Sequence, residues 1–163
     1  MVPEAIDRDL QCFLRLLQAR WGEQLVSVVL FGSWARGDAR AESDIDLLVI
    51  SKHFPRSRLD RHRDIFEAAR AVTPDFASKV SVIPLTPEEA RETKPFYLGM
   101  LTAHALLYDR DAFFATLLQR LETRLAELVQ PGGEKHPFVR RSGAWSIMIL
   151  SLDPPCPESR GAR

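Results

Sequence analysis

The stretch that decides the fold is "FGSWARGDARAESDIDLLVI", residues 31–50. It opens with the pair Gly32-Ser33 at the end of one apolar run and closes in a second apolar run that carries Asp44 and Asp46 at its start. Two carboxylates at the mouth of a buried strand cost desolvation and repel each other. A positively charged ligand would offset both costs, so the segment predicts a cation site.

The spacing of these residues suits a metal ion that carries phosphates. Side chains on a strand alternate between faces, which places Asp44 and Asp46 on the same side, about 7 Å apart along the chain. Two carboxylates on one face suit Mg²⁺, which completes its shell with phosphates and water. Gly32-Ser33 can offer N–H groups and a hydroxyl to those phosphates, and the Arg36 guanidinium can bind them as a fork. A tight turn beside two surface acids is the alternative that the spacing leaves open.

The flanking sequence predicts an alternation of helices and strands. Strands are expected at 25–31, 45–51, 79–85 and 105–109, and helices at 4–21, 55–72, 87–94, 96–103 and 111–130. Thr86 and Glu89 form the pattern of a capping box, and Asp111 is expected to cap the last helix. In the helix over 55–72, Leu59 and Phe66 are expected to point inward. The basic run over 56–63 is interpreted as a solvated face, with guidance of an anionic partner or substrate as the less common alternative.

Length and charge restrict the classes of protein. The 163 residues suffice for one domain, expected over 1–130, followed by an appendage over 131–163 whose end is expected to be disordered. Lysine plus arginine number 22 and so do aspartate plus glutamate, so bulk charge gives no argument for nucleic-acid binding. No apolar run is long enough for a membrane span and the N-terminus lacks a signal-peptide pattern, so the cytoplasm is expected. A homodimer is left open.

The central motif resembles a known signature. Gly32-Ser33, ten residues and then Asp44-Ile45-Asp46 are similar to the pattern of the polymerase-beta-like nucleotidyltransferase superfamily. The longer form "GSWARG…SDIDLLV" resembles the minimal nucleotidyltransferases, small bacterial and archaeal proteins often paired with a HEPN-domain toxin. The likeness covers about residues 20–110. It implies an α/β fold with a small mixed sheet of about four strands flanked by helices.

The resemblance also implies a chemistry. Asp44 and Asp46 would hold magnesium ions, and Gly32 and Ser33 would bind the β and γ phosphates of ATP. The implied reaction transfers AMP from ATP to a hydroxyl on a partner protein or small acceptor, and a HEPN-type toxin is the partner that the family suggests.

For Arg36 two roles stand side by side. The guanidinium can contact phosphate, or it can form an ion pair with Asp38 or Glu42.

One position departs from the family pattern. The superfamily places a third carboxylate on the next core strand, which here is "KVSVIP" with Ser81 at the matching place. The third acid helps to bind the catalytic metal and to deprotonate the attacking hydroxyl, and a serine does neither well. Low transfer activity is therefore expected. A nucleotide-binding, antitoxin-like interaction module that has lost turnover is the main alternative, and a structural subunit of a larger transferase is another.

Overall fold

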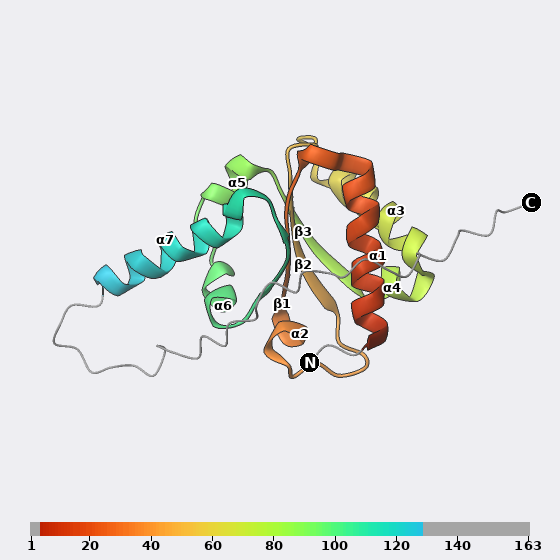
Figure 1. The fold of residues 1–163 in the computed structure, drawn as a ribbon, viewed down its shortest axis with the longest axis horizontal. Helices are drawn as coiled ribbons and strands as arrows, with labels where there is room; N and C mark the ends of the chain where they lie inside the picture. The colour runs from red at the N-terminus through yellow and green to blue at the C-terminus, as the bar shows by residue number, and fades with distance from the viewer. Residues whose placement is uncertain (1–3, 129–163) are drawn as a thin grey trace, which may run out of the picture.

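Four strands form one mixed sheet in the computed structural model, which describes residues 4–128 (Figure 1). The strands are β1 (Leu25–Phe31), β2 (Ile45–Ser51), β3 (Val80–Leu85) and β4 (Ala105–Asp109), in the order β3-β2-β1-β4. β1 pairs antiparallel with β2 and β4, whereas β2 and β3 run parallel. The predicted α/β class and mixed four-stranded sheet are confirmed. The predicted appendage over 131–163 lies outside the described residues.

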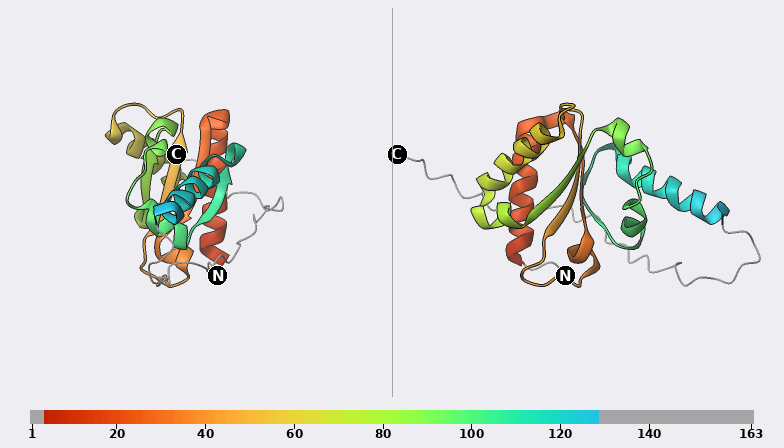
Figure 2. Two further views of the ribbon diagram at one scale, coloured as in Figure 1. Left: turned by 90° about the vertical axis from the view of Figure 1, so that its left-hand side faces the viewer. Right: turned by 180° about the vertical axis from the view of Figure 1, so that it is seen from behind.

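Helices cover both faces of the sheet, which makes three layers (Figures 1 and 2). One face carries α1 (Glu4–Trp21), α3 (Arg58–Val72) and α4 (Pro74–Lys79), and the other carries α5 (Pro87–Arg91), α6 (Tyr97–Thr102) and α7 (Phe113–Leu128). The short α2 (Gly32–Arg36) continues β1 directly, and two 3-10 turns, η1 (Gly22–Gln24) and η2 (Arg110–Ala112), complete the element order.

The two helical layers explain why the central strands are continuously apolar. Val28 and Leu47 are buried against the α1 side, together with Phe13. Val29 and Leu48 are buried against the α6–α7 side. A strand with a hydrophobic core on each face has no solvent side, so its sequence shows no alternation.

α3 corrects two predictions about inward-facing residues. Leu59 and Phe66 were expected in the core, but their side chains are 78% and 49% exposed. The helix begins three residues later than predicted, with Ser57 as its cap, whose hydroxyl accepts from the Asp60 N–H. The face that packs on the sheet holds a different set of residues, Arg61, Ile65, Ala68, Ala69 and Val72.

Arg61 therefore also corrects the interpretation of the basic run as a wholly solvated face. Its side chain is 4% exposed, and its Nη1 pairs with Glu89 Oε2 at 2.6 Å. Nε donates to the carbonyl of Pro55, and Nη1 reaches the carbonyl of Pro84 at 3.5 Å. Glu89 also closes the predicted capping box with Thr86, which is confirmed. This pair ties α3 to the first turn of α5.

The start of α7 corrects the predicted cap. Asp111 has a φ of 53° and lies in η2, outside the helix. The carboxylate of Asp109 instead accepts from the N–H groups of Phe114 and Ala115, at 2.9 and 3.0 Å, and from the Ser27 hydroxyl. One carboxylate thus joins β1, β4 and α7. The predicted helix end near residue 130 lies outside the described residues.

Among residues 4–128, no helix has the length and apolar character needed to cross a membrane.

Candidate active site

Gly32 brings the end of β1 against the start of β2. Phe31, the last residue of β1, pairs with Asp46, and Gly32 opens α2 with a φ of +72°. A Cβ built on Gly32 would collide with the carboxylate of Asp46, whose Cγ would lie 3.0 Å away. L-residues with a side chain rarely adopt this backbone region. Position 32 therefore requires glycine for two reasons, its positive φ and the close approach of the Asp46 carboxylate.

Asp46 and Asp44 stand at the mouth of β2, as the sequence indicated. Along β2, Ile45 and Leu47 are buried on the α1 side, whereas Leu48 is buried on the opposite side. Alternation therefore directs Asp46 toward the layer of α5, α6 and α7. Asp46 is half-buried at the rim of this layer, and Asp44, one residue before the strand, is exposed.

The electrostatics of this pair favour a cation. Burial raises the pKa of Asp46, the negative charge of Asp44 raises that pKa further, and Arg36 partly counteracts both. The charge of Asp44 therefore disfavours the ionised form of Asp46. A divalent ion bound by both oxygens would remove the repulsion, and hard carboxylate ligands are the kind that Mg²⁺ binds. The donor set of Asp44 and Asp46 fits such an ion, although it supplies two carboxylates rather than three.

Arg36 adopts the ion pair that was one of its two predicted roles. Its Nε lies 3.1 Å from Asp38 Oδ2, and both side chains are more than half exposed. Exposed pairs of this kind contribute little to stability, roughly 0–1 kcal/mol. Arg36 is also close enough to lower the pKa of Asp46. The guanidinium is thus held at the rim of the site by a weak bond that a phosphate could replace.

Trp34 positions the loop in front of Asp44, a role that sequence reasoning missed. The indole is buried, and its Nε1 donates to the carbonyl of Ser43 at 3.2 Å. The Ser43 hydroxyl accepts from the Arg40 N–H at 2.8 Å, which closes a turn. The peptide next to Asp44 is therefore fixed to α2. A tryptophan within the motif was visible in the sequence, but nothing there identified its acceptor.

Ser81 is the residue that the sequence pattern aligns with the third carboxylate of the superfamily it resembles. In the parallel pairing of β2 and β3, Ser81 is the partner of Asp46, and its side chain is exposed. Partners in a parallel pair present their side chains on the same face, so the serine shares the face of Asp46. Over residues 4–128, no three histidine, cysteine, aspartate or glutamate side chains are grouped so that they could share one metal ion.

Comparisons of the sequence with known proteins show what the chain is similar to. Residues 10–98 match the family model described as "Nucleotidyltransferase domain". A protein of Methanocaldococcus jannaschii named "Putative protein adenylyltransferase MJ1305" is 31% identical over 152 residues, which are 92% of this chain and 99% of that protein. A second protein of this organism, with the same type of name and the designation MJ0141, is 52% identical over 33 residues, which are 20% of this chain and 33% of its own length.

Solved structures give weaker likenesses. A toxin–antitoxin complex with AMP-PNP is 20% identical, with a TM-score of 0.49 over 72% of this chain and 90% of that chain. A complex of a Shewanella oneidensis HEPN toxin with an MNT antitoxin is 18% identical, with a TM-score of 0.46 over 74% and 90% of the two chains.

Assignment to a family rests on the sequence matches, because both TM-scores are below 0.5. The family model covers more than half of the chain, and the MJ1305 relative is matched over nearly its whole length. The chain belongs to the nucleotidyltransferase domain family.

Proposed function

We propose that this protein is a Mg²⁺-dependent nucleotidyltransferase that moves AMP from ATP to a hydroxyl of a partner protein. The observation that carries the proposal is the close fit of Asp46 against Gly32, because it joins both halves of the motif into one site. The relative named as a protein adenylyltransferase, matched over 99% of its length, supports a protein as the acceptor. A HEPN-type toxin is the acceptor that the motif's resemblance suggests.

Each residue of the site has a defined task in this proposal. The carboxylates of Asp44 and Asp46 would hold a divalent cation, which would neutralise charge on the phosphates of ATP. Ser33 and the first N–H groups of α2 have no carbonyl partner in the preceding turn, so they can donate to the β and γ phosphates. Arg36 would exchange Asp38 for a phosphate oxygen. Trp34 keeps Asp44 beside Asp46.

The proposed reaction is an in-line displacement at the α phosphorus. A bond forms from the acceptor hydroxyl oxygen to the α phosphorus, and the bond from that phosphorus to the oxygen bridging to the β phosphorus breaks. Pyrophosphate leaves, and the hydroxyl proton passes to water or to a carboxylate. Catalysis of such a transfer comes mostly from positioning and charge neutralisation. With Ser81 in place of a third acid, slow transfer is the expected outcome.

Ser81 also supports a second candidate, an antitoxin-like module that binds nucleotide without turnover. Its position next to Asp46 leaves the site without the group that usually takes the proton.

Transfer of label from ATP separates the two candidates. The protein would be incubated with a candidate acceptor, Mg²⁺ and ATP labelled at the α phosphorus, with ATP labelled at the γ phosphorus in parallel. Transfer of the α label alone supports the nucleotidyltransferase. Metal-dependent ATP binding without transfer to any acceptor, including proteins co-purified from the source cells, supports the binding module. ATP binding that needs no metal would contradict both.

A further inference from the structure

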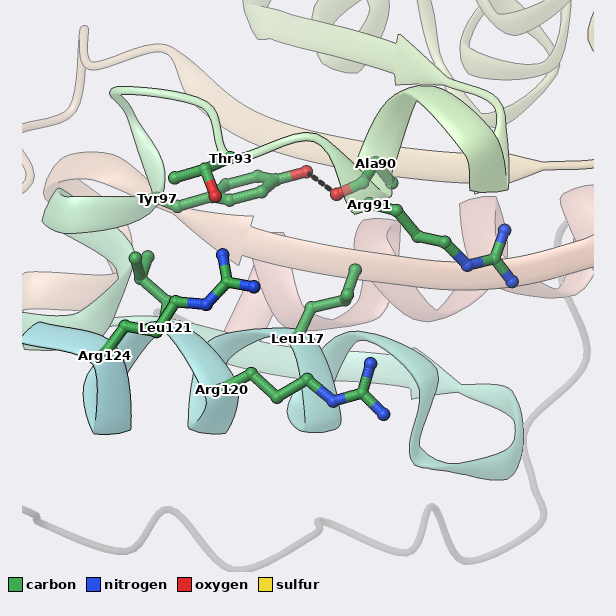
Figure 3. Close-up of a pocket in the computed structure, with 8 residues that line it drawn as sticks. All are labelled: Ala90, Arg91, Thr93, Tyr97, Leu117, Arg120, Leu121 and Arg124. Atoms are coloured by element: carbon green, nitrogen blue, oxygen red, sulfur yellow. Dashed lines mark hydrogen bonds between the residues drawn. The ribbon is translucent and has the colours of Figure 1, made fainter.

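Three arginines line one small pocket on the layer opposite α1. The pocket, of about 120 Å³, lies between the α5–α6 segment and α7 (Figure 3). Arg91 comes from the end of α5, and Arg120 and Arg124 come from α7. The fold therefore places arginines that are about thirty residues apart in the sequence around one pocket. No carboxylate is among the side chains that line this pocket.

The charges of these arginines are weakly compensated. Arg91 Nη1 lies 3.7 Å from Glu88 Oε1, with both side chains exposed, and its guanidinium lies over the Phe113 ring at 5.1 Å. Within residues 4–128, neither Arg120 nor Arg124 forms an ion pair. These two arginines are also four residues apart on one helix, a spacing at which like charges destabilise the helix by roughly 0.2–0.5 kcal/mol. Both guanidinium groups are therefore available to an anion.

The floor of the pocket adds no negative charge. The Tyr97 hydroxyl donates to the carbonyl of Ala90 at 2.9 Å (Figure 3). Burial raises the pKa of Tyr97 to about 12, so the phenol stays neutral at physiological pH. Thr93 brings a hydroxyl to the rim, and Leu117 supplies an apolar wall. The pocket therefore has an uncharged floor and is bordered by the side chains of three arginines.

We propose that this pocket binds the phosphate groups of an anionic ligand, at a place distinct from Gly32 and Asp46. Guanidinium groups match phosphate oxygens in geometry and charge, and arginine keeps its charge at every physiological pH. The outer face of α7 beside the pocket also carries Arg120 and Arg124, together with the acid Glu127. A ligand with two or three linked phosphates could extend from the pocket onto the part of this face that the two arginines form. Inorganic polyphosphate and the phosphate chain of a nucleotide share this chemistry.

The test measures binding of tripolyphosphate to the full chain in excess EDTA. Without divalent ions, Asp44 and Asp46 repel phosphate, so binding at the proposed active site is weakened, and the arginine variants locate the binding that remains. Calorimetry is expected to show binding that weakens as salt rises, because phosphate contacts are screened. Arg120→Gln/Arg124→Gln should weaken it at least tenfold.

The matched control removes two arginines from the other side of the sheet. Arg63 and Arg70 are exposed on α3, and Arg63→Gln/Arg70→Gln changes the net charge equally. This control should bind like the natural protein. The melting temperature of Arg120→Gln/Arg124→Gln without ligand should stay the same or rise slightly, because the like-charge repulsion on α7 is relieved.

Comparison of ligands identifies the source of the phosphates. ATP binding more tightly than tripolyphosphate would support a nucleotide, and equal affinities would support recognition of phosphate alone. The proposal is overturned if the natural protein does not bind tripolyphosphate in EDTA, if Arg120→Gln/Arg124→Gln binds as tightly as the natural protein, or if the α3 control loses as much affinity. None of these results depends on whether AMP transfer occurs.

Discussion

Ser81 is the β-sheet partner of Asp46. The side chains of Asp46 and Ser81 emerge from neighbouring parallel strands on the same face of the sheet, which is the geometry that two carboxylates would need to act on one bound nucleotide. This pairing is consistent with the alignment of "KVSVIP" that matches Ser81 to the superfamily's third acid. The side chain at position 81 is therefore the one to vary.

Ser81→Asp is expected to raise the rate of AMP transfer. A positioned general base contributes typically about 10²- to 10⁴-fold, and a carboxylate at this position would face the same nucleotide as Asp46. The measurement is transfer from ATP labelled at the α phosphorus. Ser81→Asn, which is similar in size but uncharged, is the control and should stay as slow as the natural protein. Equal rates for the aspartate and asparagine variants would show that the position has no catalytic potential.

Binding of ATP is expected to require Mg²⁺ or Mn²⁺ and to depend on both acids. Asp44→Asn and Asp46→Asn should each weaken metal-dependent ATP binding, because each removes one charged ligand of the proposed cation. Calorimetric titration with and without EDTA measures this directly. Asp75→Asn, which alters an exposed acid that pairs with Lys79 on α4, is the control and should bind normally. Unchanged ATP binding by both Asp44→Asn and Asp46→Asn would contradict the proposed metal site.

Ionisation of Asp46 is expected to lower the stability of the metal-free protein. Because the pKa of Asp46 is raised in the native state, the native state binds a proton more tightly than the unfolded chain does. The free energy of unfolding contributed by this group therefore falls as pH rises from about 4 through the raised value. Asp46→Asn should melt higher than the natural protein near neutral pH in EDTA, and the difference should shrink in acid. A variant that is less stable at neutral pH would contradict this sign.

Gly32→Ala is expected to destabilise the protein more than Gly37→Ala. Both glycines have a positive φ, +72° and +81°, so alanine at either position costs roughly 1–2 kcal/mol of backbone strain. Only the alanine at position 32 would also collide with Asp46, whereas no atom lies within 4 Å of a Cβ at position 37. Overpacking adds about 1–3 kcal/mol. Denaturant unfolding of the two variants measures the difference, and equal losses would show that the contact with Asp46 relaxes without cost.

Glu89→Ala is expected to cost about 3 kcal/mol, because it leaves the buried guanidinium of Arg61 without its carboxylate. It also opens the capping box with Thr86. Glu88→Ala is the matched control, since Glu88 is 80% exposed and lies 3.7 Å from Arg91. Chemical denaturation should show less than about 0.5 kcal/mol for that control.

The Arg61–Glu89 pair also predicts a pH dependence. The hydrogen bond from Arg61 lowers the pKa of Glu89, so the pair's contribution to stability is present above the ordinary pKa of glutamate and is lost as pH falls through the lowered one. A loss in the Glu89→Ala variant that persists unchanged in acid would contradict this explanation.

Sequence patterns located the strands well, because their apolar runs are long and their neighbours are turn residues. The bounds of β1, β2 and β4 agree with the prediction, and β3 begins one residue later. The motif at Gly32 and Asp46 was also recognisable, and the structure shows why position 32 is a glycine, since a Cβ there would collide with Asp46. Such features are local, and local rules are sufficient for them.

What the sequence could not provide were contacts that depend on two distant segments. In the sequence, Arg61 cannot be distinguished from the solvated residues of the basic run. Its burial depends on contacts with Pro84 in β3 and with Glu89, which are distant in the sequence. Leu59 and Phe66 are apolar and were assigned to the core, but the phase of α3 is set by its packing on the sheet, and they fall on the outer side. Asp109 caps α7 although it is the last residue of β4. Sequence rules for helix caps consider the residue directly before the helix, so they did not identify it.

Pro84 has a consequence for how this protein can assemble with others. It lies in β3, which is an edge strand of the sheet over residues 4–128, and it has no N–H to offer to a further strand. Its carbonyl oxygen lies within reach of Arg61. Exposed edges are the usual starting points for aggregation and for strand addition by peptides, and this edge is interrupted at its fifth residue. Extension of the sheet by a further strand is therefore disfavoured at the β3 edge.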